Sequence, residues 1–148
     1  MSSIKLVFGL LLASVWLAGC SLWESVDRSV NYVSEATAYI DSAARFSERV
    51  SALAEQTPFD AAAREELIGE FERMKQNIES FRQIEAPAFA ADMHARLAEY
   101  NEALMREVNL WLDRLASGTD VRSLLDSPLL QTVDQITQTL DQIRQLGQ

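Results

Sequence analysis

The chain is poor in the residues that build metal sites, disulfide frameworks and tight turns. Its 148 residues include one cysteine, one histidine, five glycines and three prolines. A single cysteine and a single histidine exclude a zinc site of the usual protein ligands and a disulfide framework. Only three glycines lie beyond residue 20, which argues against Gly-rich phosphate loops and against strands joined by tight turns. The length allows one domain.

The longest apolar run, Leu6–Ala18, follows Lys5 near the start of the chain and has 13 residues. As a helix it would extend about 20 Å, less than the roughly 30 Å hydrocarbon core of a bilayer. A positive residue, a short apolar run and small residues at its end are typical of a signal peptide. We therefore predict that residues 1–19 are a signal peptide and that residues 20–148 form one exported domain.

The run ends in Leu17, Ala18, Gly19 and Cys20, which resembles the lipobox of bacterial lipoproteins. The resemblance implies that the Cys20 sulfur receives a diacylglyceryl group and that cleavage then leaves Cys20 as the first residue. Two acyl chains suffice for a stable anchor. A free or buried cysteine in an uncleaved helix is the alternative interpretation. We thus expect the lipid bilayer as the partner of Cys20, this covalent lipid as the attached group, and no other cofactor.

The exported domain is acidic. Removal of residues 1–19 takes away Lys5 and no acidic residue, so the 13 basic side chains fall to 12 against 22 acidic ones, a net charge of −10. Nucleic acid and anionic lipid headgroups repel such a domain. We expect no nucleic-acid partner and expect the lipid, rather than charge, to hold the domain at the membrane.

Apolar residues at helical spacing predict two helices in the first half of this domain. The first begins at Ser21, which fits a capping box with Glu24, and runs to about Gln56. The second has Thr57 as its N-cap and ends near Glu85. The expected core positions are Val26, Tyr32, Val33, Ala36, Tyr39, Ile40, Ala43, Phe46, Val50 and Leu53 in the first helix and Leu67, Phe71, Met74, Ile78 and Phe81 in the second.

Two further helices are predicted in the second half. The third carries an apolar stripe over residues 93–115, including Tyr100, and Gly118 is its expected C′ residue. A short turn with Val121, Leu124 and Leu125 as a hydrophobic plug precedes Ser127 and Pro128, which begin the fourth helix. Strand-like alternation of useful length is absent and the connections are short. The sequence therefore predicts an all-α fold, an antiparallel up-down four-helix bundle after the signal peptide.

Several segments resemble an uncharacterised lipoprotein family of Bacillus-type Gram-positive bacteria. The resemblance lies in residues 31–40 and 85–87, in Asp92 and His94, and in residues 99–102, and it extends over essentially the whole chain. It implies a lipoprotein on the outer face of the cell membrane. It supplies no catalytic residues to carry over.

His94 is the one candidate for metal or acid-base chemistry, because Asp92, Glu99 and Glu102 lie near it in sequence. A partner on the same helix face would occupy position 90, 91, 97 or 98, and these hold alanine or leucine. We interpret His94 as a solvated or helix-capping residue, and a metal site completed from another helix is the alternative. Neither a nucleophile elbow nor a calcium-binding loop is present. We predict no catalytic residue and no metal site.

Two features suggest contacts with other molecules. Leu22 and Trp23 directly follow the lipidated residue, where an indole suits the headgroup level of a membrane, although Trp23 packing at the end of the bundle is an equal alternative. A row of glutamines on the outward face of the fourth helix offers hydrogen bonds without charge, suited to glycan or a partner helix, or is a merely solvated face. The row consists of Gln131, Gln135, Gln138, Gln142 and Gln145.

From these observations we expect a non-enzymatic binding or interaction module of the bacterial cell envelope. It is anchored through Cys20 at the outer face of the cell membrane, with an envelope protein or glycan as its partner. A structural spacer between membrane and wall is the alternative, and an enzyme comes third.

Overall fold

The structure is a computed structural model that describes residues 19–56 and 59–146, and of residues 19–26 it describes the backbone alone. The regular elements of these residues are all helical, which confirms the all-α prediction. In chain order they are α2 (Gly19–Glu55), α3 (Ala61–Phe81), the 3₁₀ helix η1 (Ala88–Ala90), α4 (Ala91–Ala116), the 3₁₀ helix η2 (Val121–Leu124), α5 (Pro128–Thr137) and α6 (Leu140–Leu146).

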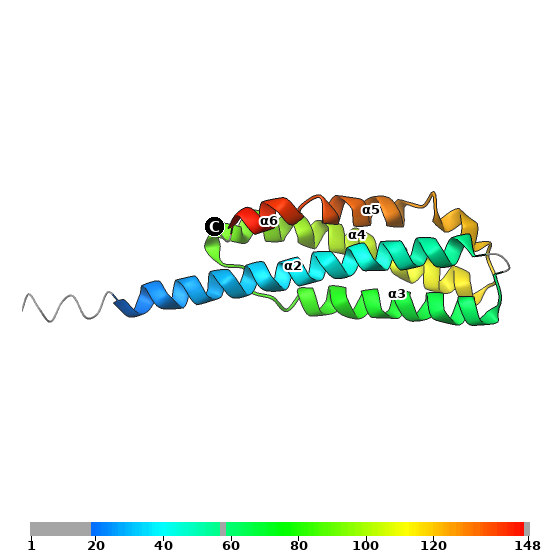
Figure 1. Cartoon of the computed structure of the whole chain (residues 1–148), viewed down its shortest axis with the longest axis horizontal. Coiled ribbons are helices and arrows are strands. Elements are labelled where there is room, and N and C mark those ends of the chain that lie inside the picture. Colours follow the sequence, from blue (N-terminus) through cyan, green and yellow to red (C-terminus); the bar gives the residue numbers. More distant parts are fainter. Residues whose placement is uncertain (1–18, 57–58, 147–148) are drawn as a thin grey trace, which may run out of the picture.

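The long helices lie side by side, and consecutive ones are joined at alternate ends of the molecule (Figure 1). Ser42 of α2 meets Asn77 of α3, and Arg49 meets Glu70, so residue numbers rise along α2 as they fall along α3. α2 also packs against α5 and α6, and α4 packs against α3 and α5. The N-terminal part of α2 extends beyond the other helices (Figure 1).

One apolar core joins the helices, and it contains nearly all of the predicted stripe positions. Residue 101 is an exception, because Asn101 is buried whereas Tyr100 is only half-buried. The largest fully buried side chains are Tyr32, Phe71, Phe81 and Trp111. This burial follows from the 3.6-residue helical repeat, which places residues three and four apart on one face.

The helix starts differ from the sequence predictions in two places. α2 begins at Gly19, so Ser21 lies within the helix and is not its N-cap. α3 begins at Ala61, and its N-cap is Asp60, whose carboxylate accepts a 2.9 Å hydrogen bond from the Ala63 amide. The prediction of Thr57 as N-cap was therefore wrong, because Asp60 is equally good cap chemistry placed next to the first helical residue.

The end of α4 is as predicted. Gly118 has a φ angle of 83°, a left-handed conformation that glycine adopts without steric cost. The Thr119 amide donates to the Arg114 carbonyl and the Gly118 amide donates to the Leu115 carbonyl, the hydrogen-bond pair of a Schellman motif. α3, in contrast, ends at Phe81, four residues before the predicted Glu85, in a turn in which the Ile84 amide bonds to the Phe81 carbonyl.

The predicted fourth helix is two helices, α5 and α6, separated by Gln138 and Thr139. The Thr137 hydroxyl donates to the Asp134 carbonyl, and the Thr139 hydroxyl donates to the Ile136 carbonyl. Such side-chain bonds compete with the helical ladder for backbone groups. The single-helix prediction was wrong because the apolar spacing continues across the break between α5 and α6 and therefore gives no sign of it.

Half of the predicted lipobox lies outside the described residues. Leu17 and Ala18 are not described, whereas Gly19 and Cys20 lie in the first turn of α2. The side chains of Cys20, Leu22 and Trp23 also lie outside the description, so their predicted membrane contacts stay predictions. Of the described helices, none has the length and apolar character needed to cross a membrane.

Candidate functional site: a groove between α2 and α3

A groove follows the line where α2 packs against α3. Its first part, which we call the aromatic section, has a volume of about 360 Å³. Its second part, the arginine section, has a volume of about 260 Å³. Ser42 and Asn77 line both sections, and the Asn77 amide donates to the Ser42 hydroxyl at 3.3 Å. The two sections therefore meet at this polar pair.

Small side chains keep the aromatic section open. Ala38 and Ser42 lie four residues apart on α2, and hence on one helix face, and Ser80 lies opposite on α3. Tyr39, Phe81 and Ile84 supply the apolar surface of the section, and Glu35 is its only charged lining residue. The section thus combines an apolar surface with a few polar groups, which is typical of small-molecule sites.

Four rings from α2, α3 and α4 contact one another in series, beginning in the lining of the aromatic section. Tyr39 of α2 and Phe81 of α3 are stacked with their centroids 4.5 Å apart. Phe81 also stacks on His94 of α4 at 5.1 Å, and His94 lies 5.8 Å from the Tyr32 ring. Contacts of this kind add about 0.5–1.5 kcal/mol to the apolar burial of each pair, so they hold α2, α3 and α4 together at this level of the bundle.

The surroundings of His94 correct its interpretation as a solvated residue. The imidazole is half-buried between Phe81 and Tyr32, and the Tyr32 hydroxyl lies 3.5 Å from its Nδ1. Burial lowers the pKa of His94 and raises the pKa of Tyr32 to about 12, because it disfavours the charged form of each ring. The residues of α4 alone indicated a solvated His94, because the two rings that cover it come from α2 and α3.

We expect the unfolding free energy to fall as the pH is lowered through the range in which His94 titrates. The pKa of His94 lies below the ordinary value of 6.5 in the folded chain, so the unfolded chain binds the proton first. The stabilisation is complete above pH 6.5 or so and is lost as the pH falls toward the lowered pKa. An NMR titration of the only histidine gives the pKa directly, and His94→Gln removes this part of the pH dependence. A pKa at or above the ordinary value contradicts the expectation.

A buried polar pair lies beside the rings. The Tyr39 hydroxyl donates to Oδ1 of Asn101 on α4, and Asn101 is 1% exposed. The Asn101 Nδ2 has no hydrogen-bond partner in the part of the chain that the structure describes. Burial raises the pKa of Tyr39, because it disfavours the charged form of the phenol. The Tyr39 hydroxyl therefore stays protonated and remains a hydrogen-bond donor.

Tyr39→Phe is expected to destabilise the bundle by about 1–3 kcal/mol, because it leaves the Asn101 carbonyl oxygen buried without a donor. Adding Asn101→Leu to Tyr39→Phe removes the unpaired amide as well, so the double variant should recover most of the loss. Urea unfolding of the two variants measures both values. A double variant no more stable than the single one would show that the amide does not carry the cost.

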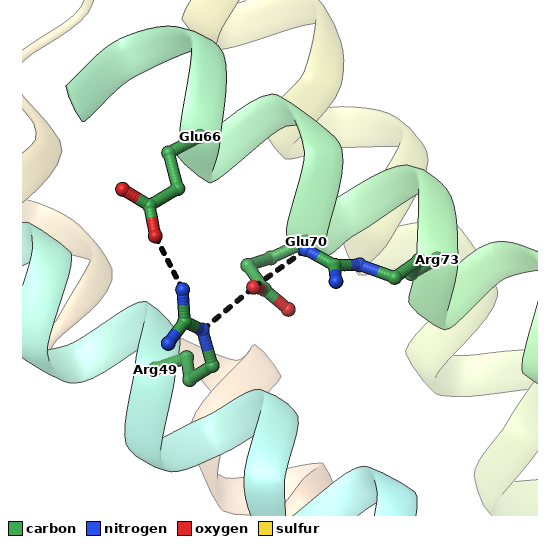
Figure 2. A network of polar contacts seen from close by, with 4 residues as sticks. All are labelled: Arg49, Glu66, Glu70 and Arg73. Carbon is green, nitrogen blue, oxygen red and sulfur yellow. Dashed lines mark hydrogen bonds and ion pairs between the residues drawn. The ribbon is translucent and has the colours of Figure 1, made fainter. Parts of the chain in front are cut away.

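The arginine section contains a network of ion pairs (Figure 2). Glu70 of α3 is buried, with 7% of its side chain exposed. Arg49 Nε and Arg73 Nη2 each donate to its Oε1 at 2.7 Å, and Arg49 also contacts Glu66. A buried carboxylate is costly unless it is paired, and the two guanidinium groups supply that pairing from opposite sides (Figure 2).

Sequence reasoning missed this network. Glu70 and Arg73 lie three residues apart on α3, and this spacing was the only available signal. Arg49 lies 21 residues before Glu70, so only the packing of α2 on α3 brings them together. Arg45, which also lines the arginine section, lies one turn before Arg49 on the same helix face.

The predicted glutamine row is exposed at all five positions, Gln131, Gln135, Gln138, Gln142 and Gln145. The break between α5 and α6 interrupts it at Gln138, whose amide donates to Asp134 at 2.6 Å. Gln142 accepts a 3.4 Å hydrogen bond from Arg96 of α4. The row is therefore a polar surface shared by two short helices, and part of it contacts α4.

The fold and the groove define a small all-helical protein, and its described residues contain no group of three or more side chains suited to hold a metal ion. The chain belongs to the family of unknown function DUF6376, whose model matches residues 32–146. It is also similar to the uncharacterized lipoprotein YybP of Bacillus subtilis (strain 168), with 32% identity over 131 residues, 88% of each chain. No solved structure matches it.

Proposed function

We propose that this protein is a lipoprotein of the bacterial cell envelope that binds a partner or ligand without catalysing a reaction. A diacylglyceryl group on Cys20 anchors it to the outer face of the cell membrane, and residues 20–148 form its extracytoplasmic domain. The motif Leu17–Cys20 supports the anchor, as does the similarity to a chain described as a lipoprotein.

The proposed orientation follows from α2. Its backbone is helical from Gly19, and Tyr32 is its first buried residue in the described part of the chain. The helical segment from Cys20 to Tyr32 extends about 18 Å at 1.5 Å per residue. We propose an antiparallel up-down bundle that stands on this segment above the membrane, with Leu22 and Trp23 at the headgroup level.

The single observation that carries the binding role is the groove between α2 and α3. It is open to solvent, its aromatic section is mostly apolar, and its arginine section is charged. Packing of Tyr39 on Phe81 and pairing of Glu70 with two arginines hold its walls in place. Side chains that are already ordered favour binding, because they lose little conformational entropy when a ligand binds.

A spacer between membrane and wall is the second candidate function. It is favoured by the 37-residue length of α2 and by the extension of its N-terminal part beyond the bundle (Figure 1). The glutamine row is the second candidate surface of a binding module, because its exposed amides can contact glycan or a partner helix at little desolvation cost.

Photo-crosslinking in intact cells tests these alternatives. The crosslinking residue is placed in turn at Ala38 in the groove, at Gln135 in the glutamine row, and at exposed Asn109 of α4 as the matched control. A discrete adduct from Ala38 alone supports the groove, and one from Gln135 alone supports the glutamine row. A membrane-bound protein that forms no adduct at either position contradicts the binding role and favours the spacer.

A further inference from the structure

The arginine section concentrates positive charge in an acidic domain. Its lining includes three arginines, Arg45, Arg49 and Arg73, and one carboxylate, Glu70. The whole chain has 13 basic and 22 acidic side chains, so most of its surface has the opposite balance. A guanidinium group matches the planar, bidentate geometry of carboxylate and phosphate oxygens. This section therefore suits an anionic group.

The network around Glu70 orders this charge. Glu70 is almost fully buried, and its Oε1 accepts from Arg49 and Arg73 together. The side chains of these arginines remain 56% and 64% exposed, and Arg49 Nη2 also pairs with Glu66, so both arginines are held in place while part of each guanidinium group still faces solvent. Arg45 has no ion pair or hydrogen bond among the described residues, and it lines the same section. One unpaired guanidinium thus lies beside two that are already held in place.

The neighbouring aromatic section sets the rest of the ligand chemistry. Ala38, Tyr39, Phe81 and Ile84 give it an apolar surface. The only charged residue lining it, Glu35, repels an anion. A ligand lying along the groove is therefore oriented, with its anionic group in the arginine section and its apolar part in the aromatic section. The Ser42 and Asn77 pair between the sections supplies a hydroxyl and an amide.

We propose that the groove binds a small amphiphile with a phosphate or carboxylate head and a short apolar tail. Arg45, Arg49 and Arg73 bind the head, and the stacked Tyr39–Phe81 pair contacts the tail. The sections of about 360 and 260 Å³ together fall within the size range of small-molecule sites. This assignment deepens the proposed binding role and rests on it.

Isothermal titration calorimetry tests the proposal on the full chain in nanodiscs of zwitterionic phosphatidylcholine, with empty nanodiscs as the blank. Hexyl phosphate is the probe, and hexanol and inorganic phosphate represent its two halves. Hexyl phosphate should bind at least tenfold more tightly than either half. Inorganic phosphate that binds as tightly as hexyl phosphate overturns the role of the aromatic section, and hexanol that does so overturns the role of the arginines.

Two variants test whether hexyl phosphate binds in the groove. Arg45→Gln should weaken hexyl phosphate binding about tenfold, the effect of losing roughly one charge-assisted hydrogen bond. Ala38→Phe should abolish binding by filling the aromatic section. The matched control Arg106→Gln removes the same charge from an exposed position on α4 and should bind as the wild type does. Equal weakening in Arg45→Gln and Arg106→Gln overturns the proposal, and thermal melts confirm that each variant is folded.

The outcome is separable from that of the proposed function. If hexyl phosphate does not bind while the Ala38 crosslink persists in cells, the ligand class is wrong and the binding module stands. If hexyl phosphate does not bind and no crosslink forms, both proposals fail.

Discussion

Cys20→Ala is expected to abolish lipid labelling of the chain and to remove its stable membrane anchor. Alanine has no sulfur to accept the diacylglyceryl group, and each buried CH₂ of the two acyl chains contributes about 0.8 kcal/mol to membrane binding. The variant should be released from the membrane fraction or should retain residues 1–19. Metabolic labelling with a fatty acid and fractionation of cells measure both effects.

Ser21→Ala is the matched control for Cys20→Ala, because it changes the neighbouring residue by one hydroxyl and leaves the acceptor sulfur in place. It should be labelled and retained as the wild type is. Lipid labelling of the Cys20→Ala chain, or retention of a processed form of it in the membrane, would contradict the anchor.

Phe71→Ala is expected to destabilise the bundle by about 3–5 kcal/mol, a large part of the stability of a domain of this size. Phe71 is fully buried, and its ring makes an edge contact with Phe46 of α2 at a centroid distance of 5.3 Å. Truncation removes the contact and leaves a cavity between α2 and α3. Urea unfolding of the chain from residue 20, followed by far-UV circular dichroism, measures the loss.

The surface residue Phe89 is the control, because it has the same side chain and is 46% exposed in η1. Phe89→Ala should change the unfolding free energy by about 0.5 kcal/mol or less. If Phe71→Ala has an effect as small as that of Phe89→Ala, the core has been assigned to the wrong face of α3.

The helices were predictable because their apolar residues recur at the helical repeat and their ends carry cap chemistry. Phe71 and its neighbours in the α3 stripe are buried as predicted, and Gly118 ends α4 as predicted. On α4 the helical repeat allows either position 100 or position 101 to face the core. The sequence prediction chose Tyr100, because it is the more apolar of the two residues. Asn101 is buried instead because Tyr39 of α2 offers it a hydroxyl.

The candidate site was not predictable, because its parts come from different helices. His94 appeared isolated on its own helix, yet Phe81 and Tyr32 enclose it from α3 and α2. The arginine section joins Arg49 to Glu70 across 21 residues of sequence. Helical spacing reports contacts three or four residues apart, so a groove between two helices leaves no pattern along either one.

The central claim is that lipid on Cys20 holds this helical bundle at the membrane, and mass spectrometry of the N-terminal peptide of the native, membrane-extracted protein tests it most directly. The account predicts a peptide that begins at Cys20 and carries a diacylglyceryl group on its sulfur. A peptide that retains the Gly19–Cys20 bond, or one with a free Cys20 thiol, would contradict it.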